Sequence, residues 1–202
     1  IASLDPNPKV ESVEKLRLAG IEVEIINDPS AITLNKRFFT QHIKLRPYFL
    51  LKTASTIDGK IADRNNHSKW ISNEDSRQFV HAQLRSNTDA ILTSYKTILQ
   101  DDASFTIRIE GEPIKETNLI IIDKELTLLN TEYNKLPIFY NRTNTKIYFI
   151  TDKKNTPVNA SSIELIEGDF NTEGLIFSSI TAQLMEKGFY SILAEGGQKL
   201  NA

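Results

Sequence analysis

An apolar run at residues 48–51 passes through Lys52 into a string of small and acidic residues that ends near Gly59. The run is nearly continuous, which is typical of a parallel strand buried on both faces. A lysine within such a strand is costly unless its ammonium group meets a partner or a ligand. Because α/β sheets open a ligand crevice beyond the carboxyl ends of their strands, the run predicts a site just after Lys52. The alternative is an edge position from which the Lys52 side chain reaches solvent.

The chain after residue 45 alternates short apolar segments with amphipathic ones. Strands are predicted at four further places, residues 90–93, 119–123, 147–152 and 191–195. Helices are predicted over residues 72–84, with Ser72 as the cap, and over residues 173–187. This alternation predicts an α/β fold with a mostly parallel central sheet flanked by helices. Glu195, like Asp123 and Asp152, follows an apolar strand, where a carboxylate either lines a site or simply begins a loop.

Residues 1–45 are organised differently. An apolar stripe near Leu16 indicates a short helix, the alternation at residues 21–25 indicates a half-buried strand, and a second helix is predicted after Asn35. The piece is too short to form a core of its own. It therefore either packs on the rest of the chain or is the end of another domain. The start at Ile1 indicates a chain that is processed or incomplete there.

The composition argues against several classes of protein. The sequence of 202 residues holds 24 basic and 26 acidic residues, and this near-neutral balance argues against a nucleic-acid-binding surface. No stretch approaches the ~18 apolar residues of a membrane span, and no signal-like segment opens the chain. Cysteine is absent, so disulfides and thiolate zinc sites cannot form. We therefore expect a cytoplasmic protein with no nucleic-acid or membrane partner.

Two later motifs bear on ligand binding. Gly196 and Gly197 follow the strand predicted at 191–195, where paired glycines either form a plain turn or let the backbone approach a phosphate. Residues 101–108 are a compact polar segment. This segment is either a solvated loop or part of a site in which Arg108 is a fork for a substrate phosphate.

The roles of the single tryptophan and of the histidines are also considered. Trp70, the one tryptophan, either belongs to the core or lines a pocket with its amphipathic ring. The histidines, His42, His67 and His81, lack metal-ligand spacing. We expect them to be surface or helix residues and predict no metal site.

A series of segments, taken in order, carries a resemblance to a known family. The segments are residues 52–60, 68–72, Arg85, 89–92, 97–102, 105–108 and 195–197. Together they resemble the reductase domain of the bifunctional riboflavin-biosynthesis deaminase/reductase family. The resemblance extends from about residue 46 to the end of the sequence.

Residues 1–45 resemble, more loosely, the end of the deaminase half of that family. The deaminase half carries a zinc site and a catalytic Glu in an H-x-E…P-C-x-x-C signature, which this sequence lacks. The resemblance therefore implies a division into residues 1–45, a C-terminal remnant of a cytidine-deaminase-like domain with a linker, and residues 46–202, a reductase domain that stops early. Deaminase activity is not expected, and zinc is expected only in the deaminase half.

The resemblance implies a fold similar to dihydrofolate reductase and a definite reaction. Members of the family use NADPH to reduce the ribosyl group of 5-amino-6-(5-phosphoribosylamino)uracil to a ribityl group. The implied partner is a small phosphorylated pyrimidine, and the implied assembly is a homo-oligomer. One alternative is another dihydrofolate-reductase-like reductase with a different pterin- or pyrimidine-like substrate. The other is a catalytically silent nucleotide-binding or oligomerisation module.

By position, the resemblance assigns roles to individual residues. The implied NADP contacts are Ala54, Trp70, Thr97, Asp101, Gly196 and Gly197. The implied substrate contacts are Ser68, Arg85, Phe105, Arg108 and Glu195. The catalytic candidates are Lys52, Asp101 and Glu195, of which Lys52 and Glu195 would face the ribose and help to transfer a proton. We expect Lys52 and Glu195 to lie side by side and to wall a single cavity.

Some positions depart from the family pattern. Residues 94–96, Ser-Tyr-Lys, stand where glycines are common, which would change the approach of the cofactor phosphates. Ala103 replaces a common proline and should loosen its loop slightly. The helix before Arg85 is one residue longer than is usual in the family.

Overall fold

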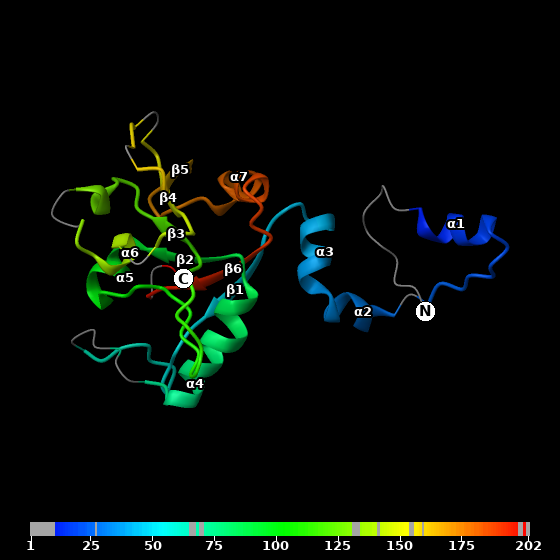
Figure 1. Cartoon of the computed structure of the whole chain (residues 1–202), viewed down its shortest axis with the longest axis horizontal. Helices are drawn as coiled ribbons and strands as arrows, with labels where there is room; N and C mark the ends of the chain where they lie inside the picture. Colours follow the sequence, from blue (N-terminus) through cyan, green and yellow to red (C-terminus); the bar gives the residue numbers. More distant parts are fainter. Residues whose placement is uncertain are drawn as a thin grey trace.

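Six parallel strands form the central layer of the structure (Figure 1). The computed structural model describes residues 11–26, 28–64, 68, 71–130, 134–140, 142–153, 156–158, 160–197 and 200. The strands are β1 (Tyr48–Lys52), β2 (Ala90–Ser94), β3 (Asn118–Ile122), β4 (Ile147–Thr151), β5 (Ile163–Glu167) and β6 (Ser191–Glu195). They pair in the order β1-β6-β2-β3-β4-β5, and every pairing is parallel. The predicted α/β fold with a mostly parallel sheet is therefore confirmed.

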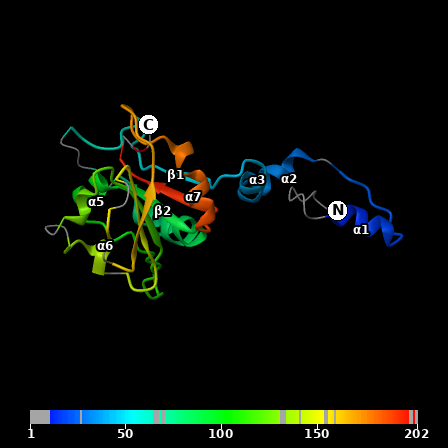
Figure 2. The ribbon, with the colours of Figure 1, turned by 90° about the horizontal axis from the view of Figure 1, so that it is seen from above.

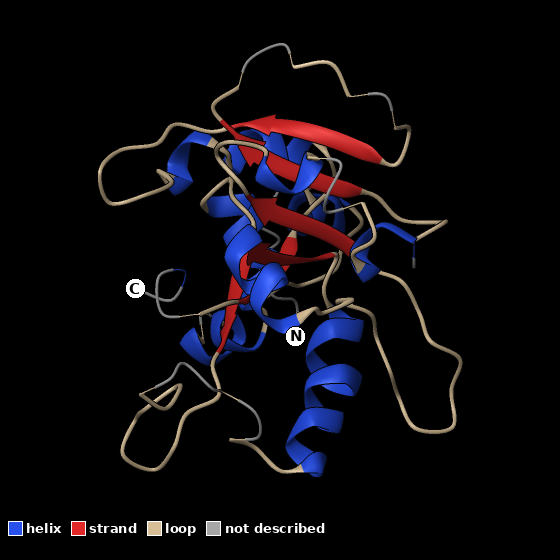
Figure 3. Ribbon diagram, turned by 90° about the vertical axis from the view of Figure 1, so that its left-hand side faces the viewer, coloured by secondary structure: helices blue, strands red, loops and turns tan. Residues whose placement is uncertain are grey.

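Helices lie on both faces of this sheet (Figure 3). The α-helices are α1 (Ser12–Leu18), α2 (Pro29–Leu34), α3 (Lys36–Ile43), α4 (Glu74–Phe79), α5 (Tyr95–Asp101), α6 (Pro137–Tyr140) and α7 (Thr181–Glu186). Helical turns of the π or 3-10 type are η1 (Val80–Leu84), η2 (Arg85–Asn87), η3 (Thr127–Leu129) and η5 (Phe177–Ser179). In the described part of the chain, no helix combines the length and hydrophobicity that crossing a membrane requires.

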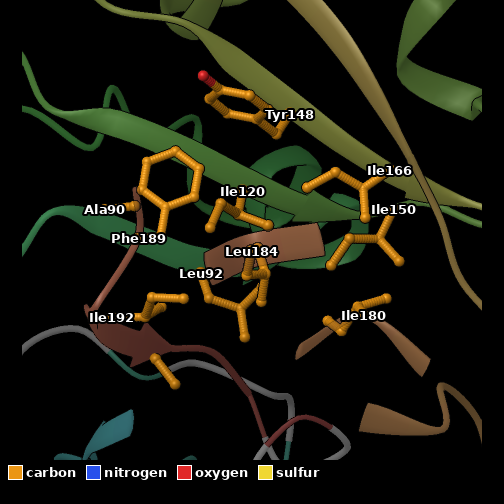
Figure 4. Close-up of a cluster of buried hydrophobic side chains, with 11 residues drawn as sticks. Ala90, Leu92, Ile120, Tyr148, Ile150, Ile166, Ile180, Leu184, Phe189 and Ile192 are labelled. Carbon is orange, nitrogen blue, oxygen red and sulfur yellow. The ribbon is translucent and has the colours of Figure 1, made fainter. Parts of the chain in front are cut away.

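Two apolar clusters, one on each face of the sheet, hold the layers together. The first packs Ile180 and Leu184, from α7 and its N-cap, against β2, β3, β4, β5 and β6 (Figure 4). The second packs α5, η3 and α6 against the opposite face. Because side chains alternate along a strand, the neighbours Ile91 and Leu92 on β2 belong to different clusters. Both faces of the central strands are therefore buried, as the continuous apolar runs predicted.

The prediction that β1 is buried on both faces is wrong. Among the described residues β1 pairs with β6 alone, and Leu51 is 57% exposed. An end strand has neighbours on one side only, so it buries less of the same apolar sequence than a central strand does. The Lys52 side chain, at the end of β1, is 30% exposed and reaches both solvent and the protein interior.

Several local predictions also need correction. Residues 173–187 do not form one helix, since α7 covers only Thr181–Glu186 and Gly174 has a φ of +136°, a conformation that no helical residue adopts. The cap of α4 is Asn73 rather than Ser72, because the Asn73 side chain accepts the Ser76 N–H at 2.9 Å. Strand β5 was missed altogether by the sequence reasoning.

The N-terminal part of the chain extends away from the sheet (Figure 2). Helix α1 buries none of its residues, and residues 21–26 form no strand, so the strand predicted at 21–25 is wrong. Helix α3 lies next to β1, and Arg37 on α3 donates a hydrogen bond to the Asn87 carbonyl at the end of η2. The division of the chain at residue 45 stays a prediction.

Helix α4 continues without interruption through η1 and η2, up to the loop before β2. Turn η1 is π-helical, so it holds one more residue than an α-helical turn of the same height. That the helix before Arg85 is one residue longer than is usual in the family stays a prediction. Because a π-helical turn rotates all that follows it, the direction of the Arg85 side chain depends on η1.

Candidate active site

Lys52 and Glu195 are neighbours at the carboxyl ends of β1 and β6. The two residues are opposite each other in the parallel pairing of these strands, so both side chains leave the same face of the sheet. Lys52 Nζ lies 4.0 Å from Glu195 Oε2. The Glu195 side chain is only 8% exposed, so the carboxylate is buried while the ammonium group stands at the surface. The predicted proximity of the two side chains is confirmed.

Arg85 brings a second cation to Glu195 from 110 positions earlier in the sequence. Arg85 Nε and Nη2 donate to Oε1 and Oε2 of Glu195 at 2.6 and 3.0 Å, and Nη1 donates to the Thr106 carbonyl at 2.6 Å. Such a two-pronged pair is directional and stronger than a neutral hydrogen bond. The centre of the Phe105 ring lies 5.8 Å from the guanidinium carbon. Since Arg85 and Glu195 are both buried, neither charge is tolerable without the other.

The surrounding cations keep Glu195 ionised. Burial by itself raises the pKa of the Glu195 carboxyl, but the hydrogen bonds and charge of Arg85 outweigh it. The Lys52 charge acts in the same direction as Arg85, so the pKa lies below its ordinary value. Glu195 is therefore a hydrogen-bond acceptor at neutral pH rather than an acid.

The segment 104–108 lies against this cluster and is fixed by buried side chains. Arg142 Nη2 donates to the carbonyls of Ser104 and Phe105 at 3.0 and 3.2 Å. Burial lowers the pKa of the Arg142 guanidinium to about 10, at which it stays charged at neutral pH. Asp102 and Phe105 have φ values of +47° and +51°, a left-handed conformation that is costly for residues other than glycine. The hydrogen bonds of Arg142 help to hold this strained backbone in place.

His81 is a member of the cluster to which the sequence reasoning gave no role. His81 Nδ1 accepts the backbone N–H of Arg108 at 3.0 Å. Burial lowers the pKa of His81 to about 4, and the positive charges of Arg85 and Arg108 add to the effect of burial. The imidazole is thus neutral at neutral pH. The one sequence signal that could have found it is the spacing of four residues between His81 and Arg85 on a helix.

Other predicted cofactor contacts lie around the same carboxyl edge of β1, β6 and β2. Ala54 follows β1, Thr97 is in the first turn of α5 directly after β2, and Gly196 and Gly197 follow β6. A Cβ at Gly196 would clash with the Leu200 side chain, so a larger residue fits there only if Leu200 moves.

The remaining predicted site residues are less closely tied to the cluster. Asp101 ends α5 and is half-buried, and in the described part of the chain no hydrogen bond or ion pair joins it to Lys52 or Glu195. Ser68 and the Arg108 side chain are exposed. Trp70 lies outside the described residues.

A cavity of about 470 Å³ lies on the other face of the sheet. Its walls include Phe49, Leu51 and Ala194, together with the cations Lys44 and Arg46. Side chains alternate along a strand, so these apolar walls point away from the face that carries the Lys52–Glu195 pair. Neither Lys52 nor Glu195 lines this cavity, so it is not the one that we expected between them.

Comparison with known proteins finds relatives along nearly the whole chain. The family model for the RibD C-terminal domain matches residues 47–202. The riboflavin biosynthesis protein RibD of Aquifex aeolicus is 34% identical over 211 residues, which cover 98% of this chain and 54% of that protein. The chain thus spans about half the length of the curated relatives it matches.

Solved structures give the same result. A diaminohydroxyphosphoribosylaminopyrimidine deaminase/5-amino-6-(5-phosphoribosylamino)uracil reductase from Thermotoga maritima superposes with a TM-score of 0.77 at 31% identity, over 97% of this chain and 52% of its own. RibD of Acinetobacter baumannii superposes with a TM-score of 0.68 at 24% identity, over 97% of this chain and 53% of its own, which supports the fold alone.

Proposed function

The chain belongs to the RibD C-terminal domain family, and from this premise we propose that it is the reductase part of a riboflavin-biosynthesis enzyme. Its six-stranded parallel sheet is of the dihydrofolate-reductase type. The proposed reaction reduces the ribosyl group of 5-amino-6-(5-phosphoribosylamino)uracil to a ribityl group with NADPH. The Thermotoga maritima relative is named as a 5-amino-6-(5-phosphoribosylamino)uracil reductase.

The observation that carries the proposal is the buried Arg85–Glu195 pair with Lys52 beside it. Two charges held in the interior cost stability, and an apolar pair of similar size would be cheaper. The pair stands at the carboxyl ends of adjacent parallel strands, where α/β folds place their ligands. A costly charge cluster in this position is typical of a working site rather than of a structural one.

The charges assign different roles to Lys52 and Glu195. For reduction, the sugar opens to an imine at C1′, and bound NADPH supplies the hydride that C1′ accepts. The electron pair of the C=N bond then moves to nitrogen, which takes up a proton. Lys52 carries the N–H donors at the surface of the cluster and is the proposed proton donor. Glu195, kept ionised by its neighbours, accepts hydrogen bonds from ribose hydroxyls and orients the sugar.

The two arginines also divide their tasks. Arg85 already uses three N–H groups on Glu195 and Thr106, so its role is to hold the carboxylate in place. The Arg108 side chain is exposed beside the cluster and offers an unburied guanidinium fork. We therefore assign the substrate phosphate to Arg108. Phe105, below Arg85, and Ser68 are the other proposed substrate contacts.

The residues around the carboxyl edge fit an NADP cofactor. Gly197 is exposed after β6, where its backbone can approach a phosphate closely. Ala54, Thr97 and Asp101 are the further proposed contacts, from the loops after β1 and β2. Trp70 is also assigned to NADP, on the basis of the family resemblance.

The proposal extends to the protein that carries this chain. Residues 1–45 are assigned to the end of a deaminase half, in which the family binds zinc and deaminates the preceding pyrimidine intermediate. The assembly is assigned as a cytoplasmic homo-oligomer that binds a phosphorylated pyrimidine.

The direct test is substrate-dependent oxidation of NADPH by the intact protein. We expect NADPH absorbance to fall when 5-amino-6-(5-phosphoribosylamino)uracil is added, and the ribityl product to form in equal amount. NADH in place of NADPH tests the cofactor preference. A preparation that binds NADPH without oxidising it would favour the silent nucleotide-binding module. Turnover of another pterin or pyrimidine in place of this substrate would favour a different reductase of the same fold.

A further inference from the structure

We propose that His81 is a positioning residue that fixes Arg108 for the phosphorylated end of the substrate. The inference rests on the proposed function, because it concerns how the same site recognises phosphate. His81 itself is assigned no contact with substrate or cofactor. It acts through the backbone of Arg108, whose exposed side chain would make the contact.

The geometry shows two side chains of one helix holding two points of one extended segment. The Arg85 Nη1 donates to the Thr106 carbonyl at 2.6 Å, and the His81 Nδ1 accepts the Arg108 N–H at 3.0 Å. Ile107, between the two points, is 7% exposed and packs inward. Because Thr106 and Arg108 are both hydrogen-bonded to the helix, the backbone position from which the Arg108 side chain extends is fixed.

The contact requires a neutral imidazole with its proton on Nε2. A protonated His81 would carry a hydrogen on Nδ1 and could not accept the Arg108 N–H. The charged groups that face His81 come from each neighbouring element: Arg85 from its own helix, Lys52 from β1, Glu195 from β6 and Arg108 from the segment that it holds. The three cations oppose protonation and only Glu195 favours it, so the acceptor form is maintained.

The π-helical turn sets the direction of both side chains. His81 lies within η1 and Arg85 follows it directly, so any change in the number of residues in η1 changes their relation. π-helical turns are frequent at functional sites. The π-helical turn before Arg85 is therefore part of the arrangement by which the helix holds segment 106–108.

The test compares two substitutions that differ in one hydrogen-bond acceptor. His81→Asn keeps an acceptor oxygen near the position of Nδ1, whereas His81→Leu removes the acceptor and keeps an apolar side chain. In the intact protein we expect His81→Leu to raise KM about tenfold, the value of one hydrogen bond of about 1.4 kcal/mol, with kcat changed less than about twofold. His81→Asn should keep KM near the wild-type value. His42→Leu, the same replacement on α3, is the matched control.

Two readouts separate this proposal from the proposed reaction. In the free protein, His81→Leu should speed hydrogen exchange of the Arg108 amide about tenfold or more, while His81→Asn and His42→Leu should not. Ribose 5-phosphate, titrated calorimetrically, should bind less tightly to His81→Leu but ribose should not. These results would stand even if the wild-type protein reduced no pyrimidine substrate.

Several outcomes would overturn the proposal. An unchanged Arg108 exchange rate or an unchanged affinity for ribose 5-phosphate in a folded His81→Leu protein would contradict it. Equal losses in His81→Leu and His81→Asn would also contradict it. If His81→Leu does not fold, His81→Gln, which keeps polarity but places its oxygen near the position of Nε2, replaces it and should show the same loss of affinity.

Discussion

Glu195 and Glu116 are two carboxylates with lowered pKa values, and they are stabilised in opposite ways. Glu195 is buried and is held by the charges of Arg85 and Lys52. Glu116 lies at the surface and accepts the backbone N–H groups of residues 143–145 at 2.8–3.1 Å. Burial raises the pKa of the Glu116 carboxyl, but these N–H groups and the Thr143 and Thr145 hydroxyls together outweigh burial and lower the pKa to about 2.

The difference distinguishes a structural carboxylate from a working one. Around Glu116, neutral donors from a single loop satisfy both carboxylate oxygens, so the interaction fixes the loop without any other charge. Around Glu195, residues from distant parts of the chain bring three formal charges together at the edge of the sheet. Charges gathered at such a cost are expected at a site of chemistry.

The largest effect is expected for Lys52→Met. Loss of the proposed proton donor should lower kcat by about 10²-fold or more, the range of general acid catalysis, while NADPH still binds. Steady-state kinetics and a cofactor titration on the intact protein measure both quantities. Lys115→Met, which removes an exposed lysine paired with Glu112, is the control. Wild-type turnover in Lys52→Met would remove Lys52 from the mechanism.

Glu195→Gln should cause a large loss of stability as well as of turnover. It leaves the buried Arg85 guanidinium without its counter-charge, which costs roughly 3–5 kcal/mol in the free energy of unfolding. Urea unfolding measures the loss. The double substitution Arg85→Met with Glu195→Met should recover much of the stability but no turnover. A double variant as unstable as Glu195→Gln would show that packing, rather than the unpaired charge, causes the loss.

Glu116→Gln should separate stability from activity. An amide cannot replace the charge that the three backbone N–H groups stabilise, so the free energy of unfolding should fall. The expected loss is only about 1–2 kcal/mol, because water screens a carboxylate at the surface. Turnover should stay at the wild-type value, since in the described part of the structure Glu116 is hydrogen-bonded to residues 143–145 and not to Lys52 or Glu195. A drop in kcat comparable to that of Lys52→Met would end the distinction between the two carboxylates.

The smallest expected effect is a difference in how His81 and Glu116 make stability depend on pH. The pKa of His81 is lowered from 6.5 to about 4, so the unfolded chain binds more protons between these values and stability falls as the pH drops from 6.5 to 4. The pKa of Glu116 is lowered from 4.5 to about 2, so its contribution is lost below pH 4.5, together with that of Glu195. Urea unfolding at a series of pH values measures the free energy of unfolding against pH. Between pH 6.5 and 4 this free energy should change less steeply in His81→Asn than in the wild type, whereas Glu116→Gln should follow the wild type. The same slope in wild type and variant would contradict the assignment.

Much of the fold could be predicted from sequence because four central strands are continuous apolar runs. β2, β3, β4 and β6 lie within one residue of their predicted positions. β1 has the same kind of sequence, but its exposure depends on its place at the end of the sheet, which no local pattern contains. β5 was missed because its two glutamates, Glu164 and Glu167, dilute the apolar run.

For the candidate site, the sequence predicted that Lys52 and Glu195 lie together but not the contacts that hold Glu195 in place. Lys52 and Glu195 each follow a strand, and the parallel sheet brings those two ends together. The hydrogen bonds from Arg85 to Glu195 and from Arg108 to His81 depend on tertiary packing. They also depend on the directions that the π-helical turn gives to the two helix side chains. The four-residue spacing of His81 and Arg85 places them on one side of a helix, but it does not indicate which residues they contact. The role of His81 could therefore be recognised only in three dimensions.

The place of β6 between β1 and β2 has a consequence for synthesis on the ribosome. β6 fills the gap between two strands that are translated long before it, as the contact between Arg85 and Glu195, 110 positions apart, illustrates. Until residues 191–195 emerge, β1 and β2 each keep an unsatisfied hydrogen-bonding edge. The nascent chain must therefore remain protected from association with other chains until this late segment inserts, and the slow step of folding is expected to be that insertion.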